Sequence, residues 1–276
     1  MLGVAVVSLW ITYALYDRVM LLGTTYRQVT DQSTGLEEKQ LYNVVEEMKV
    51  AAGLRYMPKI FIIDADYMNA FASGYSEKSA MIAITRGLMQ KLDRSELQAV
   101  MAHELSHIRH GDIKLTLTAS VLSNLMLMAI DVLFYGVIFG GSSDNRRGGG
   151  GNALVIIIMI VRILLPIVTV FLMLYLSRTR EYMADAGSVE LMRDNDPLKR
   201  ALIKIHDDHI DNADQVQAQY AKTPHEGVRR ESYIYDPTRA GFKRTGGPSE
   251  WFSTHPSIEH RLEALGFKTM KRKVSK

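Results

Sequence analysis

The sequence contains no cysteine, and this absence excludes two classes of structure. Without thiols the chain can form neither disulfide bonds nor thiolate metal sites, so a metal site has to use histidine or carboxylate ligands. The absence does not fix the compartment, but it removes any argument for a secreted scaffold held by disulfides.

The chain also lacks a strong excess of charge of one sign. Its net charge is +3 and no basic stripe with interleaved aromatic residues occurs, so we expect no nucleic-acid partner. The basic residues between Lys268 and Lys276 are interpreted as a solvated terminus, with attraction to a membrane surface as the alternative.

Hydrophobic residues make up 47% of the sequence, and they are concentrated in a few long runs. Leu115–Gly141 and Ala153–Leu176 are each long enough to cross a bilayer with some tilt, and a polar loop lies between them. We therefore predict a transmembrane helical hairpin over 115–176, with a buried hairpin of a soluble protein as the alternative. Asp131 and Arg162 are costly in lipid, so we expect them to face protein or each other.

The N-terminal run, Leu2–Tyr16, is shorter. As a helix it reaches about 22 Å, less than a hydrocarbon core of about 30 Å. No basic region precedes it and no cleavage pattern of small residues follows, which argues against a signal peptide. We interpret 1–22 as a membrane segment shortened at its start, with a peripheral apolar helix as the alternative.

Residues 26–114 have the pattern of a soluble domain. A capping box beginning at Thr34 and an apolar stripe predict a helix that Gly53 ends. The following β-rich runs predict a small sheet with strands at Lys59–Ile63, Asn69–Ser73 and Ala80–Thr85. A second capping box, Asp93-Arg-Ser-Glu96, starts another helix, and Gly111 is its natural end.

That second helix carries an H-E-x-x-H pattern, His103-Glu104-Leu-Ser-His107. Residues four apart share a helix face, so the two imidazoles can converge on one metal ion. Glu104 lies next to them and can act as a general base that takes a proton from a water activated by zinc. The pattern is short, and its surroundings have to support it.

A catalytic zinc site needs a third protein ligand. Glu181 is the candidate, because it starts a polar helix on the same side of the membrane as the histidines. Asp185 lies one turn later on the same face and can accept a hydrogen bond from a ligand imidazole. A solvated helix face with two carboxylates is the alternative interpretation.

Two further groups are candidates for contact with a substrate. His255, next to Pro256, can stabilise negative charge on the reacting oxygen, although a His-Pro pair is also typical of a simple turn. The strand residues Asn69, Ala70 and Phe71 can hold an extended peptide if the strand lies at the sheet edge, and a buried strand is the alternative. We expect the other late histidines at the surface, namely His206, His209, His225 and His260.

Residues 177–276 form the second part of the catalytic domain. The segment 207–250 is polar, lacks periodicity and is interpreted as an extended insertion or a mobile flap. Because two spans return the chain to its starting side, both parts share one compartment. More Lys and Arg residues flank the spans on that side than on the other, so the positive-inside rule places the catalytic part in the cytoplasm.

Four stretches, in this order, resemble the HtpX family, bacterial membrane-bound heat-shock zinc proteases related to the CAAX prenyl endoproteases. They are Asn69-Ala-Phe-Ala-Ser-Gly74, His103-Glu-Leu-Ser-His-Ile108 with Gly111-Asp112, Arg180-Glu-Tyr-Met-Ala-Asp185, and Ser253-Thr-His-Pro256 with Arg261-Leu262. The resemblance covers nearly the whole chain. The family opens with a complete transmembrane hairpin, whereas this chain begins inside or just before its second member.

The resemblance implies an α+β membrane protein with a mainly helical, gluzincin-type protease domain, one zinc ion and Glu181 as third ligand. It implies a location in the bacterial inner membrane and cleavage of misfolded or damaged membrane proteins. It also assigns transition-state assistance to His255 and substrate binding to Asn69, Ala70 and Phe71. The alternatives are a CAAX-type processing protease of narrow specificity and a catalytically silent membrane scaffold that keeps a structural zinc.

Overall fold

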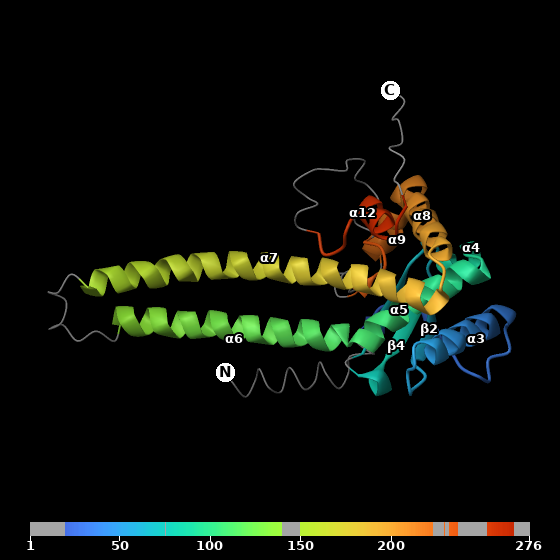
Figure 1. Cartoon of the computed structure of the whole chain (residues 1–276), viewed down its shortest axis with the longest axis horizontal. Helices are drawn as coiled ribbons and strands as arrows, with labels where there is room; N and C mark the ends of the chain where they lie inside the picture. The colour runs from blue at the N-terminus through green and yellow to red at the C-terminus, as the bar shows by residue number, and fades with distance from the viewer. Residues whose placement is uncertain are drawn as a thin grey trace, which may run out of the picture. The chain divides into compact units, whose positions relative to one another are not determined.

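The computed structural model describes residues 20–74, 76–139, 150–222, 229, 232–236 and 253–267. Apart from residues 20–22, the predicted N-terminal membrane segment 1–22 lies outside this range. Residues 114–177 form one compact unit, and the rest of the chain forms another. Both units are built largely from helices, and the unit outside residues 114–177 also holds one small sheet (Figure 1).

The elements follow in the order β1 Tyr26–Val29, α3 Leu36–Ala51, β2 Lys59–Ile63, β3 Ala70–Ser73, η1 Glu77–Ser79, β4 Met81–Thr85, α4 Arg86–Lys91, α5 Arg94–His110, α6 Asp112–Phe139, α7 Gly150–Met192, α8 Asp196–Asp211, α9 Ala213–Lys222 and α12 Ile258–Ala264. The mainly helical fold with a small sheet is therefore confirmed.

The sheet is mixed, with strand order β1-β2-β4-β3. β2 and β4 are parallel, whereas β1 and β3 pair antiparallel with their neighbours. The three strands expected from the sequence are present within one residue of their predicted bounds. β1 was not predicted, because three of its four side chains are exposed and give no apolar alternation.

Alternate residues of the strands face two different cores. Ile60, Ile62, Ala70 and Ala72 belong to the main core, which also includes the apolar faces of α3, α5 and α8. Phe61, Ile63, Phe71, Met81 and Ala83 point to the other face, where Met20, Leu21 and Tyr233 complete a second cluster. Because side chains alternate along a strand, the two alanines of β3, Ala70 and Ala72, lie toward the helices.

The helix α5 is bounded as the sequence predicts. The side chain of Asp93 accepts from the backbone N–H of Glu96, and the Glu96 side chain closes the capping box. At the other end Gly111 takes the left-handed conformation, with φ of 65°. Between these caps the buried face packs against α3 and α8, which makes α5 the central helix of its unit.

Two local expectations were wrong. The helix α3 begins at Leu36 with Gly35 as its N-cap, so Thr34 makes no capping box. The segment predicted as an extended insertion over 207–250 is helical as far as Lys222, in α8 and α9. The polar residues of these helices mask a narrow apolar face, on which Ile205 and Val216 are buried. The remainder of the insertion lies outside the described residues, except for residues 229 and 232–236.

The unit of residues 114–177 consists of the major parts of α6 and α7 (Figure 1). Asp112–Val137 and Val155–Met192 are long and apolar enough to cross a membrane, as the predicted hairpin requires. The Nε of Arg162 lies 2.7 Å from Oδ1 of Asp131, and its guanidinium covers the ring of Phe134 at 4.4 Å. The expected pairing of the two intramembrane charges is therefore confirmed.

Candidate metal centre

The H-E-x-x-H residues lie in the buried middle of α5. His103 and His107 are one helical turn apart, and their Nε2 atoms are 3.2 Å from each other. Two ligands of a tetrahedral zinc ion, each at about 2.0–2.1 Å, are expected about 3.4 Å apart. The spacing of the two nitrogens therefore fits a shared metal ion.

The third candidate ligand comes from α7. The Oε1 of Glu181 lies 3.6 Å from Nε2 of His107, and its Oε2 lies 3.8 Å from Nε2 of His103. Each of the three residues offers a ligand atom, and these atoms all lie within 4.8 Å of one another. Glu181 is 6% exposed and its Oε2 accepts no hydrogen bond from the described residues. A buried carboxylate oxygen beside two facing imidazole nitrogens is a donor set suited to zinc.

A close crossing of α5 and α7 places Glu181. A Cβ atom on Gly187 would lie 2.4 Å from Oγ of Ser106, so glycine is required at this contact. The neighbouring Ser188 donates to the backbone oxygen of Ala99 at 2.7 Å. These contacts fix the two helices that carry the candidate ligands against each other.

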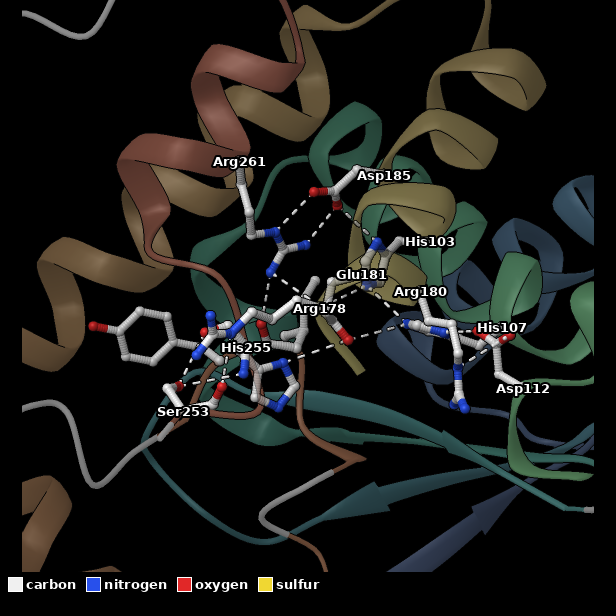
Figure 2. Close-up of polar contacts among 12 residues, drawn as sticks. His103, His107, Asp112, Arg178, Arg180, Glu181, Asp185, Ser253, His255 and Arg261 are labelled. Atoms are coloured by element: carbon white, nitrogen blue, oxygen red, sulfur yellow. Dashed lines mark hydrogen bonds and ion pairs between the residues drawn. The ribbon is translucent and has the colours of Figure 1, made fainter. Parts of the chain in front are cut away.

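Each histidine is oriented through its other ring nitrogen. The Nδ1 of His103 lies 3.0 Å from Oδ1 of Asp185, and the Nδ1 of His107 lies 2.6 Å from Oδ2 of Asp112 (Figure 2). Such carboxylates hold the Nδ1 proton and leave the Nε2 lone pair for a metal. The structure therefore brings Asp185 to the position expected from the sequence, and adds Asp112.

Burial and these carboxylates act in opposite directions on the two imidazoles. Burial lowers the pKa of His103 below its ordinary value, and the bond to Asp185 offsets this only in part. Burial alone would also lower the pKa of His107, but Asp112, Glu181 and Glu104 outweigh it and raise that pKa. His103 is thus poised to stay neutral, which is the form that ligates a metal.

The carboxylate of Glu104 is 1% exposed and lies between α5 and the strand β3. Burial is the main cause that raises its pKa to about 8, with the negative charge of Glu181 adding to the rise. The backbone N–H of Ala72, on β3, favours the charged form. The small Ala72 side chain allows this approach of strand and helix.

Residues from α12 and the turn before it complete the cluster. His255 is 4% exposed, and its Nδ1 lies 3.4 Å from Oε1 of Glu181. Arg261, on α12, makes two hydrogen bonds to Asp185 and places Nη1 3.5 Å from Oε2 of Glu181 (Figure 2). Arg178 donates to the backbone oxygen of Ser253 at 3.0 Å and ties this turn to α7.

The strand residues proposed to bind substrate are all buried. β3 is an edge strand, but Phe71 pairs antiparallel with Tyr233 across that edge. The Nδ2 of Asn69 donates to the backbone oxygen of Tyr235 at 2.8 Å. The chain's own residues therefore cover the edge that the sequence suggested for a substrate.

Three members of the centre have weak signals in the sequence. Asp112 follows the glycine that ends α5, and Arg180 and Arg261 stand inside or beside motifs without an assigned role. The Nε of Arg180 lies 3.3 Å from Oδ1 of Asp112.

Among the other histidines, His209 is fully buried on α8 and not at the surface as expected, because α8 turns it toward Tyr67 and Tyr235. His225 lies outside the described residues.

Comparison with known proteins identifies the family. Residues 35–267 match the model of peptidase family M48. A protease HtpX homologue of Helicobacter pylori (strain J99) is 41% identical over 267 residues, which are 96% of this chain and 78% of the relative. A protease HtpX homologue of Polynucleobacter necessarius is 36% identical over 92% of this chain and 80% of the relative.

The fold is also similar to a solved structure, S. mikatae Ste24p. The TM-score is 0.58 at 22% identity, and the likeness covers 97% of this chain and 57% of that chain. The family match extends over both helices that carry the candidate ligands and over the turn that carries His255. The chain therefore belongs to peptidase family M48 and is homologous to HtpX proteases over most of its length.

Proposed function

We propose that the chain is a membrane-integral, gluzincin-type zinc endopeptidase. The observation that supports this best is the convergence of His103, His107 and Glu181 beside the buried carboxylate of Glu104. When bound there, one zinc ion supplies a Lewis acid that polarises a carbonyl and activates a water. Among the described residues, only these three form a group that can hold a metal, so a catalytic site with an open position fits better than a closed structural one.

Glu104 is the general base in this proposal. Glu104 follows His103 on the same helix and is buried. Bulk water therefore does not compete with the substrate-side water as the proton donor to its carboxylate. A base works best when its pKa is close to the working pH, and burial raises the pKa of the Glu104 carboxyl above its ordinary value. Its carboxyl group then returns the proton to the leaving amine.

His255 is proposed to stabilise the developing negative charge on the substrate oxygen. Its ring lies beside Glu181 and is almost fully buried, so a hydrogen bond from it acts in a low-dielectric site. The rigid neighbour Pro256 and the bond from Arg178 to Ser253 hold the turn that carries it. His255 is thus a candidate catalytic residue in addition to Glu104.

The location and substrates are part of the same proposal. Two candidate spans and the excess of Lys and Arg on one side support an inner-membrane protein with its protease domain in the cytoplasm. Such a site has access to misfolded or damaged membrane proteins, which we propose as substrates. A panel of unfolded membrane proteins and prenylated peptides separates this substrate class from CAAX-type processing.

Exchange of Glu104 for glutamine tests the mechanism. The Glu104→Gln chain is expected to keep zinc, because the ligands are unchanged, and to lose casein cleavage by about 10²–10⁴-fold, because the base is gone. Zinc content and chelator-sensitive proteolysis are measured on the same preparations, with Glu190→Gln as a surface control. Full activity of Glu104→Gln sinks the proposed mechanism. Stoichiometric zinc without any proteolysis by the unaltered chain supports a silent scaffold.

A further inference from the structure

A short piece of the chain itself lies along the edge strand next to the metal centre. We call residues 233–235, Tyr233-Ile234-Tyr235, the edge segment. It meets β3 in one isolated antiparallel bridge, in which Tyr233 lies opposite Phe71. It is separated from β3 by more than 150 residues of sequence, so its place on this edge is a tertiary contact and not a hairpin.

Backbone groups of the edge segment bond both to β3 and to side chains next to it, although the segment bends at Ile234 and Tyr235. The N–H of Ile234 donates to the backbone oxygen of Ala70 at 2.9 Å, and the N–H of Tyr235 donates to Oδ1 of Asn69 at 3.4 Å. The oxygen of Tyr235 accepts from Nδ2 of Asn69 at 2.8 Å. The side-chain amide of Asn69 thus bonds both the N–H and the C=O of Tyr235. These bonds use only backbone groups of the segment, so they do not depend on the identity of its side chain.

The backbone carbonyl of Ile234 connects the segment to the candidate metal centre. Arg261 donates through Nη1 to the backbone oxygen of Ile234 at 2.9 Å. The same guanidinium binds Asp185 twice and lies 3.5 Å from Glu181. The side chain of Arg261 therefore contacts both the backbone oxygen of Ile234 and the candidate metal ligand Glu181.

The side chains of the edge segment fill defined positions. Ile234 is 2% exposed in the main core, and Tyr233 packs edge-on against Phe71 with ring centroids 5.5 Å apart. The hydroxyl of Tyr235 bonds Nδ1 of His206 at 3.0 Å. The edge segment thus places a buried aliphatic residue between two aromatic ones beside β3.

We propose that the edge segment occupies the place of a polypeptide substrate and acts as a competitor built into the chain. This inference rests on the proposed endopeptidase function. A substrate binds by replacing the segment's backbone bonds to Ala70, Asn69 and Arg261 with the same kinds of bond, so the exchange requires no new binding groups. A competitor on the same chain has an effective concentration on the order of millimolar, which raises the substrate concentration needed for binding. Substrates with an aliphatic residue between aromatic ones are expected to compete best.

A reversible covalent lock tests the proposal. Directly opposed residues of an antiparallel pair have Cα atoms about 4.5–5.5 Å apart, within the range that a disulfide spans. The chain has no other cysteine, so the pair Phe71→Cys and Tyr233→Cys can form only one intramolecular bond. The lock is made in the full chain with Glu104→Gln, in detergent, and oxidised and reduced forms of the same protein are compared.

Binding of fluorescent casein is the readout, measured by anisotropy at equal zinc content. We expect the oxidised form to bind at least about tenfold more weakly than the form reduced with a phosphine, because the locked segment cannot leave. Equal affinities of the two forms overturn the inference. A different result would contradict the proposed function itself: no casein binding by the Glu104→Gln chain without the cysteines, together with no casein cleavage by the unaltered chain. This inference would then be contradicted as well, because it rests on that function.

Hydrogen exchange gives a second test that leaves the segment unaltered, in case the cysteine pair does not fold. Saturating casein is added to Glu104→Gln, and exchange is followed in the fragment that contains residues 232–236. Displacement predicts at least about tenfold faster exchange of these amides, while the amides of β4 keep their protection. Unchanged or slower exchange with casein bound overturns the inference.

Discussion

The carboxylate of Asp185 accepts two hydrogen bonds from the Arg261 guanidinium and at the same time lies against the imidazole of His103. Nε of Arg261 donates to Oδ2 at 2.8 Å, Nη2 donates to Oδ1 at 2.5 Å, and that same Oδ1 is 3.0 Å from Nδ1 of His103. Three elements, α5, α7 and α12, are thus joined through one carboxylate. The orientation of His103 depends on a residue 158 positions later in the chain.

The carboxylates behind the histidines are predicted to set metal affinity. Asp185→Asn and Asp112→Asn each weaken the hold on a ring Nδ1 proton, and each is expected to reduce zinc affinity by about 10–100-fold. Competition with a chromophoric chelator measures this. Asp208→Asn, which alters a carboxylate paired with Lys91 away from the centre, is the matched control. Affinities equal to that of the control contradict a role in ligand orientation.

Loss of Arg261 is predicted to destabilise the protease domain. Arg261→Met leaves Asp185 buried without its cation, and breaking a buried pair in this way costs about 3–5 kcal/mol. Thermal unfolding in detergent measures the change. The control Arg109→Met breaks an exposed pair with Glu190 and is expected to cost less than about 1 kcal/mol. A similar small effect for both substitutions disproves this prediction.

Gly187→Ala is predicted to force α5 and α7 apart. The added Cβ meets Oγ of Ser106 at 2.4 Å and Cβ of Ser106 at 2.8 Å, and such overpacking costs about 1–3 kcal/mol. Ser106→Gly removes both atoms, so the double variant is expected to be more stable than the sum of the two single changes. Denaturant unfolding of the four proteins in the cycle gives the coupling. Strict additivity counts against a steric contact.

His209 is predicted to make the protease domain sensitive to mild acid. Its Nδ1 bonds the backbone oxygen of Ile205 at 2.8 Å, and burial lowers its pKa from 6.5 to about 4. Because the unfolded chain takes up the proton first, stability is complete above about pH 6.5 and falls as the pH drops toward 4, by about 3 kcal/mol. The measurement is unfolding free energy against pH.

The matched variant for this effect is His209→Phe, which keeps an aromatic ring against Tyr235 at the position of the imidazole. Phenylalanine cannot be protonated, so the loss of unfolding free energy between pH 6.5 and 4 is expected to be smaller in this variant by about 3 kcal/mol. The prediction fails if the pH profile of His209→Phe has the same slope as that of the parent.

The intramembrane pair Asp131–Arg162 is predicted to stabilise the hairpin. Each single reversal, Asp131→Arg or Arg162→Asp, leaves two like charges together between apolar helices and is expected to lower the yield of folded protein in detergent. The double reversal restores opposite charges and is expected to recover most of it. A double variant that assembles worse than either single one would count against the pairing.

Much of the fold could be predicted from local patterns. The capping box at Asp93 and the glycine at position 111 set the limits of α5 because these interactions are made within a few residues. The long apolar runs predicted α6 and α7 for the same reason, since hydrophobic length is a local property. The patterns failed where polar residues cover a helix, as in α8 and α9, and where exposed residues form an edge strand, as in β1.

The sequence by itself determined the pair of imidazoles and the neighbouring carboxyl group of Glu104, because a helix of fixed pitch brings residues four apart to one face. It also favoured Glu181 as third ligand by its place after the hairpin. Only the tertiary structure decided that Arg261 joins Asp185 to Glu181, that His209 is buried, and that residues 233–235 lie along β3. These contacts join residues far apart in the chain, and their geometry depends on how whole elements pack, which no short pattern contains.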